Sequence, residues 1–227
     1  MILYIDTAFD KTILAIKKDG KIFEEKINEN ANISQILVQK TDDLLKKIGI
    51  KKTDIKLIGF NKGPGNFTSL RVALAYVKAI GYYLNIPIVA LNSFQILALS
   101  KPDMDDNYPM IIAIDARMDE IYWTNYEGNE IFSDKQSYEL SSCNTFYKKL
   151  TKLKYKKINL IKNKSEILSD NNKLPSLISA SVFNSKGINL DEIFFSIETL
   201  FANNFVNTAD EVNLLYIRDN VAQKKHE

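Results

Sequence analysis

A short glycine-proline segment constrains the fold of this chain most. It reads Gly63-Pro64-Gly65-Asn66 and lies between an apolar run at residues 57–60 and a long apolar segment that ends near Leu84. Glycine reaches positive φ at little cost and proline fixes φ, so two glycines around a proline leave the backbone few paths. Asn66 is a favourable N-cap, so we expect a strand, a tight loop and a helix that begins at Phe67.

Two interpretations of this junction are open. The unpaired backbone N–H groups at a helix N-terminus can receive an anion or a partner's carboxylate. The segment is not a P-loop, because no Gly-Lys-Ser/Thr follows at the required spacing. A tight turn without any ligand is the plainer alternative. Arg71 lies near the same helix end, which is unfavourable for a cation, so we expect it to have a carboxylate or phosphate partner, with one inside the chain favoured.

Composition narrows the class of protein. With 227 residues, a net charge of +2 and 45% hydrophobic residues, the chain has enough material for a sizeable core and no strong global charge. The single cysteine, Cys143, rules out an internal disulfide and fits a reducing cytosol. The N-terminus lacks a signal-peptide pattern, and no apolar run is long enough to span a membrane. The only histidine is His226, which excludes a metal site built on several His and Cys but leaves a carboxylate-only site open.

The pattern of apolar residues predicts alternating strands and helices. Three strands joined by hairpins come first, and helices then alternate with strands, which predicts a mixed sheet covered by helices. The expected strands are residues 2–5, 12–16, 22–27, 57–60 and 88–91, and the expected helices are residues 34–48, 67–84 and 93–99. Residues 101–107 read as a linker. Beyond it we expect a helix over 145–153, a strand over 158–161 and a helix over 190–202, and we leave 178–187 unassigned.

The part of the chain after the linker reads as a weak second copy of the first. Ile5-Asp6-Thr7-Ala8 is matched by Ile114-Asp115-Ala116-Arg117, and Gly20 and Ile22 are matched by Gly128 and Ile131 at nearly the same distance. A repeat of this period indicates a duplicated domain. We therefore expect an α/β fold with one lobe at 1–101 and a second at 107–227, whose tail packs back on the first lobe.

Asp6 and Asp115 each end a first strand, where the chain turns into the next. In duplicated folds of this kind that turn can hold phosphates between the lobes, and the aspartate can position a metal. The alternative is that each aspartate makes an Asx turn with its own backbone.

A basic tract runs through the second copy. It contains eight lysines and no acidic residue: Lys148, Lys149, Lys152, Lys154, Lys156, Lys157, Lys162 and Lys164. It could form a patch near RNA. A solvated face is the favoured interpretation, because no pattern of stacking aromatic residues accompanies the lysines.

Three motifs in order resemble the TsaB (YeaZ-like) family of bacterial tRNA threonylcarbamoyladenosine biosynthesis proteins. They are Ile5–Ala8, Gly63–Arg71 and Ile114–Tyr122, and the tail at 216–225 resembles that family's C-terminal signature. Ser69 departs from the pattern, because the family usually has glycine there. The resemblance implies an actin-like ATPase (ASKHA) fold of two duplicated lobes, each with a mixed β-sheet covered by helices.

The resemblance also implies a non-catalytic role in the cytoplasm. Related chains pair with the threonylcarbamoyl transferase TsaD, whose metal-binding His pair this chain lacks, and the ATPase TsaE joins the assembly. No cofactor or metal is expected, and tRNA would be reached only through the complex. The motif residues would then be vestiges of nucleotide loops: Asp6, Thr7, Gly63, Pro64, Gly65, Phe67, Thr68, Arg71, Asp115 and Arg117. An active kinase or ATPase of the same fold is the alternative, whereas a metallopeptidase fails on its missing ligands.

The helix at 67–84 is apolar on more than the one stripe that a sheet requires, so it needs a second neighbour. Ala75 and Ala79 are four residues apart and share a face, which permits close helix approach. We expect this helix and the one at 34–48 to contact the transferase, or a second copy of this chain when the partner is absent. The expected interface residues are Ile36, Leu37, Leu44, Leu70, Leu74, Ala75, Val77, Lys78 and Ala79.

Overall fold

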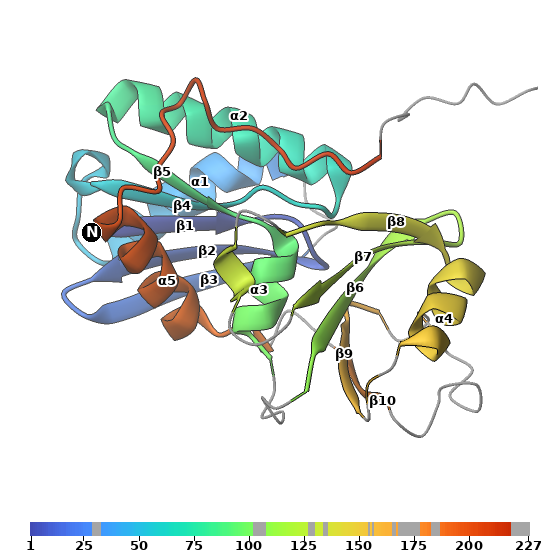
Figure 1. Cartoon of the computed structure of the whole chain (residues 1–227). Coiled ribbons are helices and arrows are strands. Elements are labelled where there is room, and N and C mark those ends of the chain that lie inside the picture. The colour runs from blue at the N-terminus through green and yellow to red at the C-terminus, as the bar shows by residue number, and fades with distance from the viewer. Residues whose placement is uncertain are drawn as a thin grey trace, which may run out of the picture.

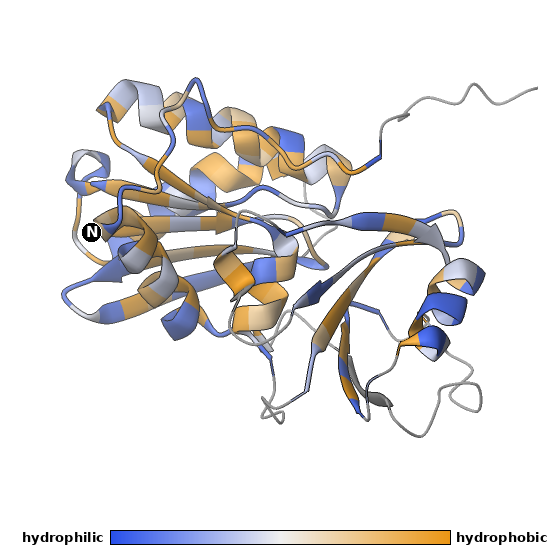
Figure 2. Ribbon diagram, in the orientation of Figure 1, coloured by the Kyte–Doolittle hydropathy of each residue, from blue (hydrophilic) through white to orange (hydrophobic). Residues whose placement is uncertain are grey.

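The chain forms two five-stranded sheets that lie next to each other in the computed structural model (Figure 1). The structure describes residues 1–28, 33–101, 108–126, 130–133, 136–153, 155, 157–164, 167, 178–182 and 187–218. Residues 102–107 of the predicted linker lie outside the described residues, as does the tail beyond residue 218, with His226. Figure 2 shows that the central strands of both sheets are mainly hydrophobic, as expected for strands covered by other elements.

The first sheet has the strand order β3-β2-β1-β4-β5. β1 pairs antiparallel with β2 and parallel with β4, so the sheet is mixed as predicted. Its strands are β1 (Ile2–Asp6), β2 (Lys11–Lys18), β3 (Lys21–Asn28), β4 (Leu57–Asn61) and β5 (Ile88–Leu91). The helices α1 (Ile33–Lys47) and α2 (Phe67–Leu84) lie together on one face of this sheet. A short 3-10 helix, Lys52–Asp54, precedes β4.

The second sheet repeats this order. Its strands run β8-β7-β6-β9-β10 across the sheet, so β6 takes the central place of β1. Their bounds are β6 (Met110–Arg117), β7 (Glu120–Tyr126), β8 (Glu139–Ser142), β9 (Ile158–Lys162) and β10 (Ile178–Val182), and α4 (Cys143–Lys152) follows β8 as α1 follows β3. The prediction of two duplicated lobes, each with a mixed sheet covered by helices, is confirmed.

Two helices cross between the lobes and give them a common core. α3 (Ser93–Leu99) follows the first sheet but packs against β6 of the second. α5 (Leu190–Ala202) follows the second sheet but packs on the first, where Phe194 meets Tyr4 edge-on at 6.2 Å and Glu198 pairs with Lys17 at 2.8 Å. Buried side chains from both lobes therefore form one continuous apolar cluster.

The periodicity of apolar residues predicted the bounds of α2 as they are observed, and each bound of α1 to within one residue. The sequence matched Ile131 to Ile22, which lies in β3, but Ile131 lies in a 3-10 helix (Glu130–Phe132) and the third strand of the second sheet is β8. The residues between β7 and β8 instead contact α3: Gln95 Nε2 donates to the Ile131 carbonyl, and Tyr138 stacks on Phe94 at 4.9 Å. Gly128 lies outside the described residues. β10 falls in the stretch left unassigned.

Packing of α5 on the first sheet depends on the missing side chain of Gly59. A Cβ at this position would lie 2.4 Å from Cδ1 of Ile197 and 3.1 Å from Cδ2 of Tyr4, and both side chains are fully buried. We expect Gly59→Val to destabilise the chain by about 1–3 kcal/mol, the usual cost of overpacking a core. Thermal and urea unfolding followed by circular dichroism would measure the change.

Gly187→Val is the matched control for Gly59→Val, because no described residue lies within 4 Å of a Cβ built at Gly187. Its stability should stay within about 0.5 kcal/mol of the wild-type value. Equal stability of the two variants would show that α5 is not seated closely on β4.

Candidate functional site

The first motif aspartate is sealed inside the first lobe. Asp6 is fully buried at the end of β1; Tyr4 Oη donates to its Oδ2 at 3.1 Å, and the Ala8 backbone N–H donates to its Oδ1 at 2.9 Å. Burial raises the pKa of the Asp6 carboxyl, while the hydrogen bond from Ala8 acts to lower it. The contact with Ala8 is that of an Asx turn, which is the alternative that the sequence left open for Asp6.

The Gly63–Asn66 loop lies directly on the turn that follows Asp6. A Cβ at Gly65 would be 2.3 Å from the Ala8 carbonyl oxygen and 2.8 Å from its Cα, so only glycine permits this approach. Asn66 N–H donates to the same carbonyl at 2.9 Å, and Gly63 N–H donates to Oδ1 of Asn61 at 2.9 Å. These two N–H groups are therefore already hydrogen-bonded within the chain and are not available to bind an anion.

One polar group beside this loop has no described partner. The Thr7 hydroxyl is buried and makes no hydrogen bond among the described residues, whereas the Asn61 side chain acts as a hydrogen-bond partner that lowers the pKa of the Asp6 carboxyl. Oδ1 of Asn61 accepts from Ser93 Oγ at 3.0 Å, which ties the loop to the start of α3. Pro64 is buried and follows a cis peptide bond. Asp6, Thr7, Gly63, Pro64 and Gly65 thus form one packed cluster.

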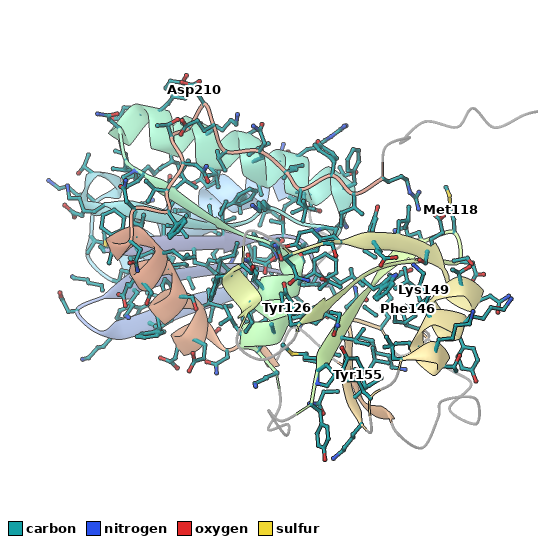
Figure 3. The ribbon with its side chains drawn as sticks, viewed as in Figure 1. Met118, Tyr126, Phe146, Lys149, Tyr155 and Asp210 are labelled. Carbon is teal, nitrogen blue, oxygen red and sulfur yellow. The ribbon has the colours of Figure 1, made fainter. Side chains whose placement is uncertain are left out.

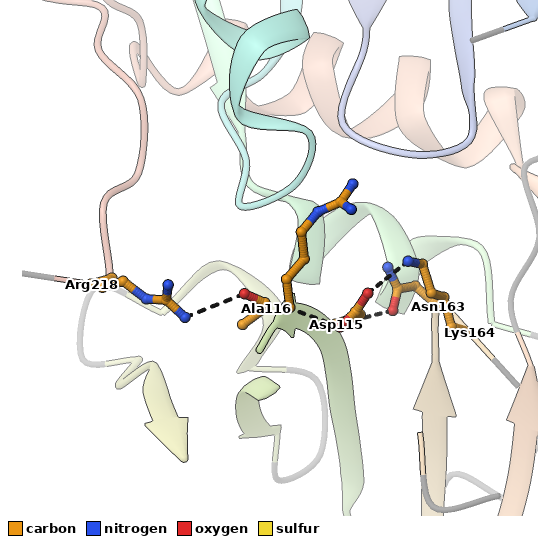
Figure 4. Close-up of polar contacts among 6 residues, drawn as sticks. Asp115, Ala116, Asn163, Lys164 and Arg218 are labelled. Atoms are coloured by element: carbon orange, nitrogen blue, oxygen red, sulfur yellow. Dashed lines mark hydrogen bonds and ion pairs between the residues drawn. The ribbon is translucent and has the colours of Figure 1, made fainter. Parts of the chain in front are cut away.

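The second motif aspartate repeats the turn of the first. Asp115 Oδ1 accepts from the Arg117 N–H at 2.9 Å, as Asp6 Oδ1 accepts from Ala8 (Figure 4). Its Oδ2 pairs with Lys164 Nζ at 2.6 Å, and its own N–H donates to Oδ1 of Asn163 at 2.9 Å. Burial acts to raise the pKa of Asp115, but the ion pair with Lys164 and the bond from Arg117 outweigh it and hold that pKa below its usual range.

A strained hairpin follows Asp115. Arg117, Met118 and Asp119 have φ of 61°, 54° and 59°, and Arg117 is cross-strand to Glu120. Positive φ at both central residues is the signature of a type I′ turn, which connects twisted antiparallel strands tightly. Arg117 and Met118 are exposed at its tip, and Met118 keeps 84% of its surface accessible. The tip of the hairpin is therefore accessible to solvent.

The chemistry available at these loops is limited. The carboxylate of Asp115 already has a lysine counter-ion, and that of Asp6 is buried. Among the described residues no group of three His, Cys, Asp or Glu side chains is placed to hold a metal. Burial and the neighbouring Asp119 raise the pKa of the Cys143 thiol to about 11, so this cysteine is protonated near neutral pH.

Helix α2 presents an exposed face that the sheet does not use. Leu70, Ala73 and Val77 point into the core, whereas Thr68, Arg71, Ala75 and Ala79 are exposed along the opposite side. At the C-terminal end of this face Tyr82 and Tyr83 keep 61% and 75% of their surface accessible. Small residues thus lie at the centre of the face and aromatic residues lie at its end.

Four residues expected at a partner interface are buried within the chain. Leu37, Leu44, Leu70 and Val77 are at most 3% exposed, because they fill the layer between α1, α2 and the first sheet, and they are removed from the candidate surface. Leu74, Lys78 and Ile36 are half-buried beside the exposed face. Val38 of α1, which keeps 42% of its surface exposed, is added to the candidate surface.

Arg71 does not have the carboxylate partner that the sequence suggested. No ion pair of Arg71 is found among the described residues; its guanidinium carbon lies 3.8 Å from the centre of the Phe67 ring. An aromatic face attracts a guanidinium and leaves its N–H groups directed outward. The helix begins as predicted, with Oδ1 of Asn66 accepting from the Ser69 N–H at 3.3 Å. Arg71 is therefore an exposed cation at the start of the α2 face.

The basic tract is partly engaged within the second lobe. Lys149 pairs with Glu139 and lies 5.1 Å from the Trp123 ring, Lys162 is buried and donates to the Ile167 carbonyl, and Lys164 pairs with Asp115. Figure 3 shows Lys149 beside Phe146 on the side of α4. Lys154 and Lys156 lie outside the described residues.

Comparison with known proteins identifies the family. The family model of TsaD, tRNA N6-adenosine threonylcarbamoyltransferase, matches residues 25–225. The chain is 29% identical over 132 residues to the tRNA threonylcarbamoyladenosine biosynthesis protein TsaB of Escherichia coli, covering 57% of this chain and 56% of that protein. It is 27% identical to the protein of the same name from Buchnera aphidicola of Schizaphis graminum, over 69% of this chain and 75% of that one.

The fold has solved counterparts. YeaZ from Pseudomonas aeruginosa superposes with a TM-score of 0.72 at 20% identity, over 95% of this chain and 98% of that one. A second structure, described as an uncharacterized protein with similarity to peptidase YEAZ from Pseudomonas aeruginosa, gives a TM-score of 0.73 over 96% of this chain and 99% of that one. Within the described part of the chain, no helix has the length and apolarity needed to cross a bilayer.

Three motifs, the duplicated lobes and the matched relatives agree with one another. The resemblance drawn from the sequence is thereby confirmed, and the two-lobed actin-like α/β fold it implied agrees with the observed topology. The chain belongs to the family of the tRNA N6-adenosine threonylcarbamoyltransferase TsaD, as a TsaB/YeaZ-type protein of tRNA threonylcarbamoyladenosine biosynthesis.

Proposed function

We propose that this chain is a non-catalytic scaffold subunit that pairs with the transferase TsaD, with the ATPase TsaE joining the assembly. The observation that carries the proposal is the exposed face of α2, with Ala75 and Ala79 at its centre and Tyr82 and Tyr83 at its end. In this complex the chain supports transfer of a threonylcarbamoyl group to tRNA without supplying a reacting group.

The shape of this face fits a helix from a partner. Two alanines four residues apart allow a second helix to approach closely, while the half-buried Leu74 and Lys78 flank the contact. Tyrosine and arginine are enriched among the residues that dominate binding energy, and Tyr82 and Arg71 stand near opposite ends of the face. A transferase of the same fold would present matching helices, and a second copy of this chain could do so when the transferase is absent.

The motif loops support the non-catalytic part of the proposal. A nucleotide would need free backbone N–H groups at the Gly63–Asn66 loop and an aspartate able to reach a metal. The observed loop bonds Gly63 and Asn66 inside the chain, and Asp115 is paired with Lys164. The sequence, moreover, contains a single histidine, His226, so it cannot supply a His pair.

We propose no independent tRNA-binding site on this chain. The described lysines of the basic tract partly serve ion pairs and packing within the second lobe, which lowers the charge left for a phosphate backbone. Strong binding of a nucleic acid would require several free cations along one track. Contact with tRNA is accordingly assigned to the assembled complex.

A large charge on the α2 face should disrupt pairing with TsaD. Ala75→Arg and Ala79→Glu place a charge where a partner helix would bury it without a counter-ion, so we expect each to weaken binding by at least about 30-fold. Calorimetric titration of the purified chain with the transferase from the same organism would measure the change. Circular dichroism would confirm that both variants are folded.

Lys148→Glu on α4 is the control for these variants, because it changes charge on the exposed side of the other lobe. It should bind as the wild type does. If Ala75→Arg and Ala79→Glu are folded and also bind normally, then α2 is not the interface.

The isolated chain should not turn over nucleotide. Because both motif aspartates are engaged within the chain, we expect ATP hydrolysis far below the ordinary enzyme range, which is on the order of 1 s⁻¹ or more. A steady-state assay with Mg²⁺ tests this. Turnover at an ordinary rate that Asp115→Asn or Asp6→Asn abolishes would favour the kinase or ATPase alternative.

A further inference from the structure

The segment after α5 returns across the whole molecule. We call residues 203–218 the C-terminal strap. It leaves the end of α5, forms an antiparallel bridge between Asn207 and Ile88 of β5, and then runs along α2 toward the second lobe (Figure 1). Its residues Ala209, Val212 and Leu214 are buried, so the strap is a packed part of the first lobe.

At one end of the α2 face the strap holds Tyr82. The Tyr82 hydroxyl donates to the Asp210 carboxylate, and Lys78 Nζ donates to the Asp210 carbonyl at 3.2 Å. Figure 3 shows Asp210 directly beside α2. Tyr82 nevertheless keeps 61% of its surface exposed, so the contact fixes a side chain that the core does not require.

At the other end of the face the strap adds an aromatic residue. Leu215 N–H donates to the Lys62 carbonyl at 2.8 Å, just before the Gly63–Asn66 loop. The ring of Tyr216 then meets Phe67 edge-on at 6.2 Å, and the guanidinium of Arg71 covers Phe67. Tyr216 is 55% exposed, so the strap extends the α2 surface with a tyrosine that α2 does not contain.

Two residues further on, the strap reaches the second lobe. Arg218 donates to the Ala116 carbonyl at 3.3 Å (Figure 4). It also pairs with Glu120, and its other terminal nitrogen lies 3.9 Å from Sδ of Met118. A single extended segment therefore bonds to the first lobe at Leu215 and to the β6–β7 hairpin at Arg218. The strap therefore connects the start of the Gly63–Asn66 loop to the hairpin of the second lobe.

We propose that the C-terminal strap is part of the partner-binding surface: it holds Tyr82 and Tyr216 in place at the two ends of the α2 face, and Arg218 anchors it to the second lobe. This inference rests on the proposed function, because it takes a helix of TsaD as the occupant of the face. Side chains that are held in place before binding lose less conformational freedom when the partner arrives. The strap therefore raises affinity without lying at the centre of the contact.

The test uses the full chain and the transferase of the same organism. Asp210→Ala frees Tyr82, and Arg218→Gln removes the ion pair with Glu120; each should weaken binding about 3- to 10-fold, mainly through faster dissociation. Glu198→Gln is the control, because it breaks a similar ion pair, that with Lys17, on α5. It should leave affinity unchanged, and thermal melting would report the stability of all three.

A double-mutant cycle separates this role from a general loss of stability. Tyr82→Phe removes only the hydroxyl that Asp210 holds, so Asp210→Ala should weaken binding much less in the Tyr82→Phe background than in the wild type. If the two changes are additive, or if both strap variants bind as tightly as the wild type while Ala75→Arg does not, the strap inference is wrong and the proposed interface stands. Normal binding by Ala75→Arg as well would refute the proposed interface itself.

Discussion

Direct contact between two backbones, at Gly65 and Ala8, determines what the rest of this structure can do. The Gly63–Asn66 loop lies on the turn after β1 with no side chain between them, and Asn66 N–H bonds the Ala8 carbonyl at 2.9 Å. This contact engages the Asn66 N–H within the chain, so that group is not available to an anion. It also fixes the start of α2, and so the direction in which the exposed face of that helix points.

The consequences of this contact reach the second lobe through two connections. α3 and α5 each pack on the sheet of the other lobe, which joins both sheets in one core. The C-terminal strap adds a connection at the surface, from Lys62 beside the loop to Glu120 of the β6–β7 hairpin. The two lobes share the same motif, an Asx turn at Asp6 in the first and at Asp115 in the second. Through these connections both turns belong to one framework that positions the exposed face of α2.

The sequence predicted the elements of the first lobe well because its signals are local. Asn66 caps α2 and periodic apolar residues mark the helix, so its bounds follow from the pattern. Tertiary contacts decided what the sequence missed. Burial of Leu70 and Val77 depends on the neighbouring helix and sheet, and the partner of Arg71 is an aromatic ring rather than an acid. Ile131 lies in a 3-10 helix, where its carbonyl accepts a hydrogen bond from Gln95 of α3. No local signal indicated that Arg218 would reach Glu120, 98 residues away.

The central claim is that a TsaD partner covers the α2 face and the strap beside it. Hydrogen–deuterium exchange of the chain, alone and saturated with the transferase, tests this most directly because it reports every described element at once. The account predicts slower exchange in α2 and in residues 203–218, and unchanged exchange in α4 and α5. Slower exchange confined to α4 or to α5, with α2 and the strap unchanged, would contradict it.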